Sequence, residues 1–217
     1  MTNPHPPFAI VLAGGRSSRM GTAKAALPTG GVTVIGRIVR ELRKVFSTIV
    51  IVAAPADQET FAQETFAIEL GADSAVDIKI IRDDIAFAGP VRALAAGLAT
   101  GPGDRAFACS CDLPLIKSSV VAALIAMLGQ HDAVIPAVDG KLQMLHAVYN
   151  RRCAEALRDM EARGTRRLAA LADIVDVRLV GEDELRVIDP GLESFFNLNT
   201  PADYDRLQRI LGIDTEE

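Results

Sequence analysis

Short apolar runs recur along the first two thirds of the chain, and each is closed within two residues by a glycine, an aspartate or a proline. Runs of this length that end in turn-forming residues are typical of strands buried in a parallel sheet. The predicted strands cover residues 8–12, 48–53, 78–81, 106–111 and 133–138.

Between these runs the apolar residues follow helical spacing. In the segment 35–45, apolar side chains recur every three or four positions and basic side chains occupy the other faces, which predicts an amphipathic helix. A helix opening at Pro55 and helices over 91–99 and 120–128 are predicted on the same grounds.

This alternation predicts right-handed crossovers, and therefore an α/β fold: a three-layer, αβα, Rossmann-like arrangement around a mainly parallel sheet. Ligands of such sheets bind where the carboxyl ends of the strands meet. The 217 residues suit a single domain, 1–217, with an ordered core at about 8–211.

After Asp139 the alternation loosens. The pattern there predicts a strand over 145–149, a helix over 153–162, a strand near 175–180, and strand pieces at 187–188 and 195–199. A last helix with Leu207, Ile210 and Leu211 on one face is predicted to start at Thr200, because Pro201 and Asp203 follow it as in a capped first turn.

Composition narrows the class of protein. The net charge of −5 argues against binding to nucleic acid. The longest apolar run, 120–128, is too short to span a membrane, and no leader segment opens the chain, so a cytoplasmic location is expected. Cys109, Cys111 and Cys153 form no Cys-x-x-Cys pair and are interpreted as packed thiols rather than ligands or nucleophiles.

The segment 12–24 carries the strongest chemical signal. Gly14 and Gly15 directly follow an apolar strand, and Arg16, Arg19 and Lys24 come next, so backbone N–H groups and three cations are available to an anion. The spacing fits neither a Walker A loop nor a dinucleotide fingerprint. A triphosphate cradle is therefore favoured over the alternative of a solvated, flexible loop.

Polar residues end two further strands. Asp83 and Asp112 follow the strands 78–81 and 106–111, so both are expected beside the glycine-rich loop at one edge of the sheet. Asp112 precedes Leu113-Pro114 and is the predicted Mg²⁺ ligand, since Mg²⁺ takes few carboxylates plus substrate phosphates. Asn199 is a candidate second ligand. The alternatives are a turn aspartate and a capping asparagine.

Four motifs, spread from about Phe8 to Leu211, resemble those of the molybdenum cofactor guanylyltransferases, a branch of the nucleotidyltransferases. They are Leu-Ala-Gly-Gly-x-Ser-x-Arg-Met-Gly-x-x-Lys at 12–24, Arg82-Asp83-Asp84 followed by Gly89-Pro90, Cys111-Asp112-Leu113-Pro114, and Asn197-Leu198-Asn199-Thr200-Pro201. The segment 143–149 is similar to one that lines the acceptor side in that family, but its His146 is interpreted as a packed residue rather than a general base.

The resemblance implies a nucleotidyltransferase fold and transfer of GMP from GTP to the phosphate of molybdenum-bearing molybdopterin, with release of pyrophosphate. It implies Mg²⁺ as cofactor, and molybdoenzyme apoproteins or cofactor chaperones as further partners. Arg19, Lys24 and Asp112 would be catalytic, and Asp112 and Asn199 would bind the metal. The nucleotide would be held by Leu12, Ala13, Gly14, Gly15, Lys24, Asp83 and Asp112.

Two positions depart from the family pattern. Ala23 stands where many relatives have an aspartate before the loop lysine, and no asparagine follows the second strand near Ala53. Gly14 matches the guanine-using form of the loop, whereas an alanine is usual among cytidylyl relatives. A cytidylyltransferase, a sugar-phosphate nucleotidyltransferase and a non-catalytic nucleotide-binding chaperone of the cofactor therefore remain as alternatives.

Overall fold

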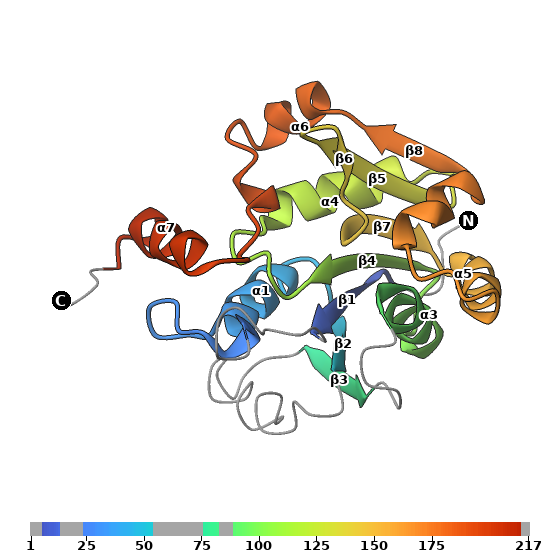
Figure 1. Ribbon diagram of the computed structural model, residues 1–217, viewed down its shortest axis with the longest axis horizontal. Helices are drawn as coiled ribbons and strands as arrows, with labels where there is room; N and C mark the ends of the chain where they lie inside the picture. Colours follow the sequence, from blue (N-terminus) through green and yellow to red (C-terminus); the bar gives the residue numbers. More distant parts are fainter. Residues whose placement is uncertain (1–5, 14–23, 54–75, 83–88, 214–217) are drawn as a thin grey trace.

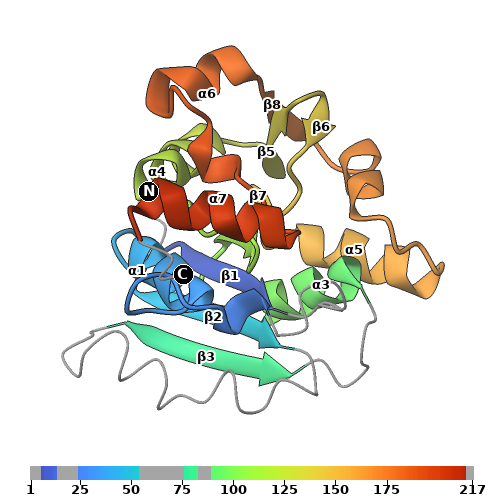
Figure 2. The ribbon, with the colours of Figure 1, turned by 60° about the vertical axis from the view of Figure 1, so that its left-hand side comes forward.

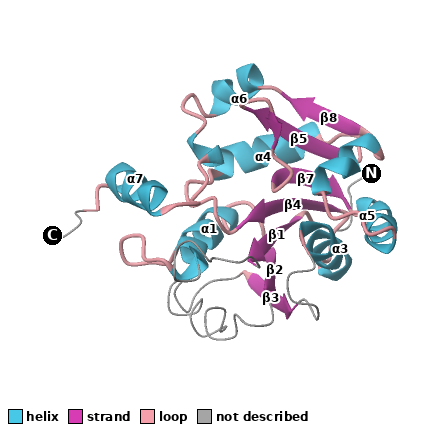
Figure 3. Cartoon of the chain, in the orientation of Figure 1, coloured by secondary structure: helices cyan, strands magenta, loops and turns pink. Residues whose placement is uncertain are grey.

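The computed structural model describes residues 6–13, 24–53, 76–82 and 89–213. Within these residues, eight strands form one sheet in the order β3-β2-β1-β4-β7-β5-β6, with β8 paired to β5 (Figures 1 and 3). The strands are β1 (Phe8–Ala13), β2 (Thr48–Ala53), β3 (Asp77–Arg82), β4 (Arg105–Ser110), β5 (Ala133–Val138), β6 (Lys141–Leu142), β7 (His146–Asn150) and β8 (Val177–Val180).

The half of the sheet that contains the predicted site is parallel. β2 and β4 both pair with β1 in parallel, and β3 pairs with β2 in the same sense. Every residue of β1 and β2 is buried, as expected for apolar strands covered on both faces. The carboxyl ends of these strands therefore lie along one edge, as the sequence predicted.

The other half of the sheet is mixed. β7 lies between β4 and β5 and is antiparallel to both, whereas β8 is parallel to β5. The prediction of a mainly parallel sheet is thus confirmed for its core, and β7 interrupts the pattern because it is the return arm of a hairpin. Asp139 and Gly140, both at positive φ, form the tight turn of that hairpin between β5 and β6.

Helices cover both faces of the sheet (Figure 2). α1 (Val34–Leu42) and α4 (Ser118–Met127) pack on one face, while α3 (Pro90–Thr100) and α5 (Cys153–Ala162) pack on the other. Side chains of β1 alternate between the two cores that result: Ala9 and Val11 belong to one, and Phe8, Ile10 and Leu12 belong to the other. The three-layer prediction is confirmed.

α3 approaches β1 closely because it carries glycine where the two elements meet. A Cβ on Gly97 would lie 2.7 Å from Ile10, and one on Gly101 would lie 1.9 Å from Phe8. Neither glycine has a positive φ, so close packing, rather than backbone conformation, requires them.

Two predicted strand pieces are wrong. Residues 187–188 end α6 (Glu182–Ile188), whose first turn holds three acidic residues that favour a helix N-terminus. Val187 is 83% exposed, so its apolar character does not mark burial in a sheet. The segment 195–199 begins within the short 3₁₀ helix η3 (Glu193–Phe195) and continues without joining the sheet.

The end of the chain follows the prediction. Thr200 caps α7 (Pro201–Leu211), with a complete capping box formed with Asp203 and with proline in the first turn. Two 3₁₀ helices complete the described elements, η1 (Lys24–Ala26) and η2 (Leu168–Asp173). In the parts of the chain that the structure describes, no helix has the length and apolar character needed to cross a membrane.

Candidate active site

The candidate site begins where β1 and β4 end side by side. The backbone N–H of Cys111 donates to the carbonyl oxygen of Leu12 at 3.0 Å, which extends the pairing of the two strands by one residue. Asp112 follows directly and so projects from the edge of the sheet at which the glycine-rich loop starts. Backbone pairing thus brings Asp112 next to the end of β1, Leu12–Ala13, while residues 14–23 of the loop lie outside the described residues.

Asp112 has an unusual environment for a carboxylate. Its Oδ1 atom is buried and has no hydrogen-bond partner in the described residues. A buried carboxylate oxygen without a donor costs free energy, and a bound cation removes that cost. This orphaned oxygen is the feature of the site that fits a metal ion.

The C-terminal segment docks against the same residue. The backbone N–H of Leu198 donates to the carbonyl oxygen of Asp112 at 2.8 Å. Leu198 is fully buried, while Asn197 and Asn199 on either side of it are exposed. In an extended segment side chains alternate in direction, so both asparagines point away from the side on which Leu198 is buried.

Lys24 and Asn199 meet although 175 positions separate them in the chain. The Lys24 Nζ atom donates to Asn199 Oδ1 at 2.8 Å. A lysine that follows the glycine-rich loop in the sequence and an asparagine near the C-terminus are therefore in direct contact. That Asn199 binds a metal through this oxygen stays a prediction, because here the oxygen accepts from an ammonium group.

The metal-binding capacity of the site is small. No group of three or more His, Cys, Asp or Glu side chains that could hold a metal occurs within residues 6–13, 24–53, 76–82 and 89–213. One carboxylate, one amide oxygen and substrate phosphates suit Mg²⁺, which keeps water and substrate oxygens as ligands, better than an ion that needs a protein cage.

Asp203 holds the backbone of this segment in place. Its Oδ2 atom accepts from the backbone N–H groups of Asn199 and Thr200, at 3.0 and 2.7 Å, and from the Thr200 hydroxyl at 2.9 Å. Partial burial opposes ionisation, but these hydrogen bonds and the charge of Lys24 outweigh it and lower the pKa of Asp203. Asp203 is therefore both the helix cap that the sequence predicts and a residue that holds the backbone of Asn199.

The Asp203→Ala variant should lower the free energy of unfolding by about 1–2 kcal/mol at neutral pH, the cost of losing a helix cap. Asp205→Ala, two residues on in the same helix and exposed, is the matched control, with an expected change within about 0.5 kcal/mol. Because the folded pKa is lowered, the contribution of Asp203 is present at neutral pH and fades as the pH falls through that pKa. Urea unfolding at pH 7 measures both variants, and equal losses would contradict the role given to Asp203.

His146 is a packed residue, as the sequence analysis interpreted it. It is 1% exposed, and its ring lies 5.3 Å from the Phe107 ring and 4.3 Å from the Phe195 ring, measured between centroids. Its Nε2 atom is 3.4 Å from the Ser194 hydroxyl. Burial lowers the pKa of His146 to about 3, and the charge of Asp189 opposes that shift only in part. The imidazole is therefore neutral at physiological pH.

The buried imidazole should make stability fall in acid. The unfolded chain takes up a proton near pH 6.5 whereas the folded chain does so near pH 3, so the free energy of unfolding decreases as the pH falls between these values. From pH 6.5 to 5 we expect a loss of about 1–2 kcal/mol from this residue. His146→Phe should remove that part of the pH dependence, and the control His131→Gln, at a half-buried histidine beside Asp176, should keep it. Denaturant unfolding at both pH values measures the slopes. Parallel slopes for wild type and His146→Phe would refute the assignment.

An ion pair between the half-buried Lys117 and the buried Asp189, which the sequence does not predict, supports the segment leading to the asparagines. The Asp189 side chain is fully buried; its Oδ1 accepts from Lys117 Nζ at 2.6 Å, and its Oδ2 accepts from the Ser194 backbone N–H at 2.8 Å. Lys117 also contacts Glu193 at 2.8 Å. Burial disfavours the ammonium, but these two carboxylates raise the pKa of Lys117. Nothing in the sequence around Lys117 predicts Asp189 as its partner, since the two residues are 72 positions apart.

The remaining predicted residues divide into two groups. Leu12 and Ala13 are buried and end β1, so they reach the site edge through their backbone. Gly14, Gly15, Arg16, Arg19, Ala23 and Asp83, together with the helix predicted from Pro55, lie outside the described residues. None of the three cysteines is in a disulfide; Cys109 and Cys153 are buried, and burial raises the pKa of each.

Comparison with known proteins agrees with this geometry. Residues 9–177 match the model of the MobA-like NTP transferase domain. The chain is 31% identical over 202 residues to a probable molybdenum cofactor guanylyltransferase of Methanosarcina mazei, covering 92% of this chain and 88% of that protein. It is 32% identical over 205 residues to a molybdenum cofactor guanylyltransferase of Desulfosudis oleivorans, covering 93% and 94%.

A solved structure supports the same likeness. The crystal structure of molybdopterin-guanine dinucleotide biosynthesis protein A from Archaeoglobus fulgidus superposes with a TM-score of 0.74 and 25% identity, covering 94% of this chain and 98% of that one. The similarity therefore extends over nearly the whole chain, including the segment that carries Asn197 and Asn199.

Proposed function

Because the chain belongs to the MobA-like NTP transferase family and is thus a nucleotidyltransferase, we propose that it transfers GMP from GTP to the phosphate of molybdenum-bearing molybdopterin. The products are the guanine dinucleotide form of the cofactor and pyrophosphate. The observation that supports this most is the convergence of Lys24, Asn199 and Asp112 at the end of β4.

In the proposed reaction an oxygen of the acceptor phosphate attacks the α-phosphorus of GTP, and the bond from that phosphorus to the bridging oxygen of pyrophosphate breaks. No side chain has to act as a nucleophile. Lys24, at the start of η1, carries the positive charge that the departing pyrophosphate needs, and its bond to Asn199 fixes the position of that charge. The acceptor phosphate is ionised near neutral pH, so no general base is needed, which agrees with the buried, neutral His146.

We propose Mg²⁺ as the cofactor, held by Asp112 and Asn199. When bound it would neutralise phosphate charge and align the two phosphates. The buried Oδ1 of Asp112, a carboxylate oxygen without a hydrogen-bond partner in the described residues, supports this assignment. Arg19, Gly14, Gly15 and Asp83 are proposed to hold the nucleotide, on the strength of the motif alone. The cytoplasm is the proposed site of action, and an apo-molybdoenzyme or a cofactor chaperone would then receive the product.

Pyrophosphate release tests the function directly. Purified protein is mixed with Mg²⁺, molybdenum-bearing molybdopterin and each of the four nucleoside triphosphates in turn, and release is expected only with GTP. Equal turnover of CTP would overturn the guanine assignment, which rests on Gly14. Binding of GTP without release, with any acceptor, would instead identify a nucleotide-binding cofactor chaperone.

A further inference from the structure

The last helix, α7, is fastened to the segment that follows the glycine-rich loop by a contact to which the proposed reaction assigns no role. The Tyr204 hydroxyl donates to the backbone carbonyl oxygen of Pro28 at 2.7 Å, although 176 positions separate the two residues. Lys24 and Asn199, which lie a few positions earlier in the same two segments, are joined by their own hydrogen bond. The start of α7 therefore runs alongside residues 24–28, in the same direction (Figures 1 and 2).

The backbone that carries Lys24 and Pro28 is held as one unit. The backbone N–H of Leu27 donates to the Lys24 carbonyl oxygen at 3.2 Å. The N–H of Val34, the first residue of α1, donates in turn to the Leu27 carbonyl oxygen at 2.9 Å. A contact that fixes Pro28 therefore also fixes the point from which the Lys24 side chain extends.

The first turn of α7 is a unit of the same kind. The backbone N–H of Tyr204 donates to the Thr200 carbonyl oxygen at 3.2 Å. The Asp203 carboxylate accepts from the backbone N–H groups of Asn199 and Thr200. The Tyr204 hydroxyl and the Asn199 side chain are thus carried by the same capped helical turn.

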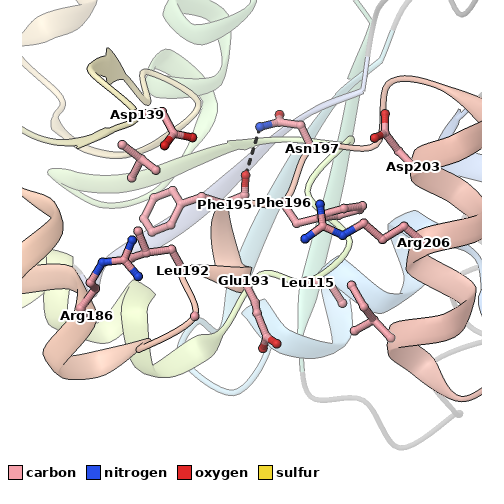
Figure 4. A pocket seen from close by; sticks show the side chains of 13 residues that line it. Leu115, Asp139, Arg186, Leu192, Glu193, Phe195, Phe196, Asn197, Asp203 and Arg206 are labelled. Atoms are coloured by element: carbon pink, nitrogen blue, oxygen red, sulfur yellow. Dashed lines mark hydrogen bonds between the residues drawn. The ribbon is translucent and has the colours of Figure 1, made fainter.

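Two further contacts of α7 stabilise its docking without setting its exact position. Leu207 is fully buried among apolar side chains of the core. On another part of the helix, the Arg206 guanidinium lies over the Phe196 ring, 5.3 Å from its centroid (Figure 4). Such contacts tolerate small displacements, whereas a hydrogen bond weakens steeply as its distance and angle change. The hydroxyl of Tyr204 is therefore suited to fix where α7 lies along residues 24–28.

We propose that Tyr204 is a positioning residue, which through Pro28 keeps the Lys24 ammonium within reach of its amide partner. This role rests on the proposed function, in which Lys24 supplies charge to the departing pyrophosphate. The contacts form a closed ring, from Lys24 to Asn199, along the first turn of α7, and back through the tyrosine hydroxyl. Without that hydroxyl the two segments can shift past each other. A charge that is less well positioned before the reaction stabilises the transition state less.

Chemical labelling tests the positioning without any substrate. Amines of the ligand-free protein are acetylated briefly with acetic anhydride, and mass spectrometry compares Lys24 with the exposed Lys141 on β6. Asn199→Ala removes the partner and gives the labelling rate of the amine without it. Tyr204→Phe keeps the ring and should raise the Lys24 rate about two-fold or more, toward that of Asn199→Ala. Thr100→Val is the matched control, because the Thr100 hydroxyl also donates to a backbone carbonyl, at 2.9 Å, but at the end of α3; it should leave the rate unchanged.

Steady-state kinetics then tests the consequence for GMP transfer. Tyr204→Phe should lower kcat about two- to ten-fold, the range that the loss of one neutral hydrogen bond allows, and should change KM for GTP by a smaller factor. In an Asn199→Ala background the same substitution should lower kcat no further, because the pair that it positions is already broken. Thr100→Val should match wild type in both constants.

The proposal is overturned if Tyr204→Phe leaves Lys24 labelling unchanged, leaves the kcat of an active enzyme unchanged, raises KM alone, or lowers kcat equally in the presence and absence of Asn199. The two proposals fail separately. If wild type releases no pyrophosphate but Lys24 labelling depends on the Tyr204 hydroxyl as described, the proposed function fails and the positioning role stands. If wild type transfers GMP while Tyr204→Phe is labelled like wild type, the positioning role alone fails.

Discussion

Replacing Asp112 by alanine should lower the rate of GMP transfer at least about a thousand-fold, because the Mg²⁺ ion that we propose Asp112 binds would contribute several kcal/mol of charge stabilisation. The same change should not destabilise the metal-free protein. Its Oδ1 is buried without a partner, so removing the carboxylate relieves a cost in the folded state, and a gain of about 1 kcal/mol in unfolding free energy is expected. Activity and stability should therefore change in opposite directions.

Two measurements check this pair of effects: pyrophosphate release at saturating GTP and acceptor, and denaturant unfolding without divalent ions. Asp112→Asn keeps the volume and removes the charge, and should lose nearly as much activity as the alanine variant. Added Mg²⁺ should stabilise wild type but neither variant. Near-full activity in Asp112→Ala would sink the metal assignment, and a large loss of stability would mean that the carboxylate has a structural partner.

Replacing Lys24 by alanine should reduce kcat/KM for GTP about 100- to 1000-fold, the range found when one positioned donor to a developing charge is removed. Lys24 and Asn199 are joined by a 2.8 Å hydrogen bond, so they are expected to act as a unit. The double variant Lys24→Ala/Asn199→Ala should then lose much less than the product of the two single losses. Lys141→Ala, exposed on β6, is the control cation.

Steady-state kinetics with GTP varied at fixed acceptor measures these variants. A loss confined to KM would mean that Lys24 binds the triphosphate equally well before and during transfer, whereas a fall in kcat marks an interaction made in the transition state. Multiplicative losses in the double variant would contradict the coupling, and unchanged kcat/KM in Lys24→Ala would remove this lysine from the site.

Much of the parallel half of the molecule was predictable because its signals are local. Buried strands such as 48–53 are continuous apolar runs, and the position of Asp112 directly after a predicted parallel strand placed it at the edge where β1 and β4 end. The contact between Lys24 and Asn199 could not be predicted from the hydrophobic pattern. Only the order of the four motifs suggested that residues near the two ends of the chain share one site.

The mixed half was harder to predict because the deciding interactions are distant or depend on a turn. Asp139-Gly140 is a hairpin signal that was available in the sequence, and recognising it would have placed β7 as a return strand. The residues 187–188 were misassigned because two adjacent apolar residues favour a strand when the acidic first turn before them is overlooked. The cation–π contact between Arg206 and Phe196 has no sequence signal, since it depends on how α7 packs against the segment that carries Phe196.

The hydrogen bond from Leu198 to Asp112 also determines when the protein becomes competent during synthesis. A nascent chain that has passed residue 112 already contains the glycine-rich loop and the carboxylate, yet it lacks the segment that binds the backbone of Asp112 and supplies Asn199. The candidate site is thus completed by residues made long after its other half, and a prematurely released chain would contain the glycine-rich loop and Asp112 without Asn199.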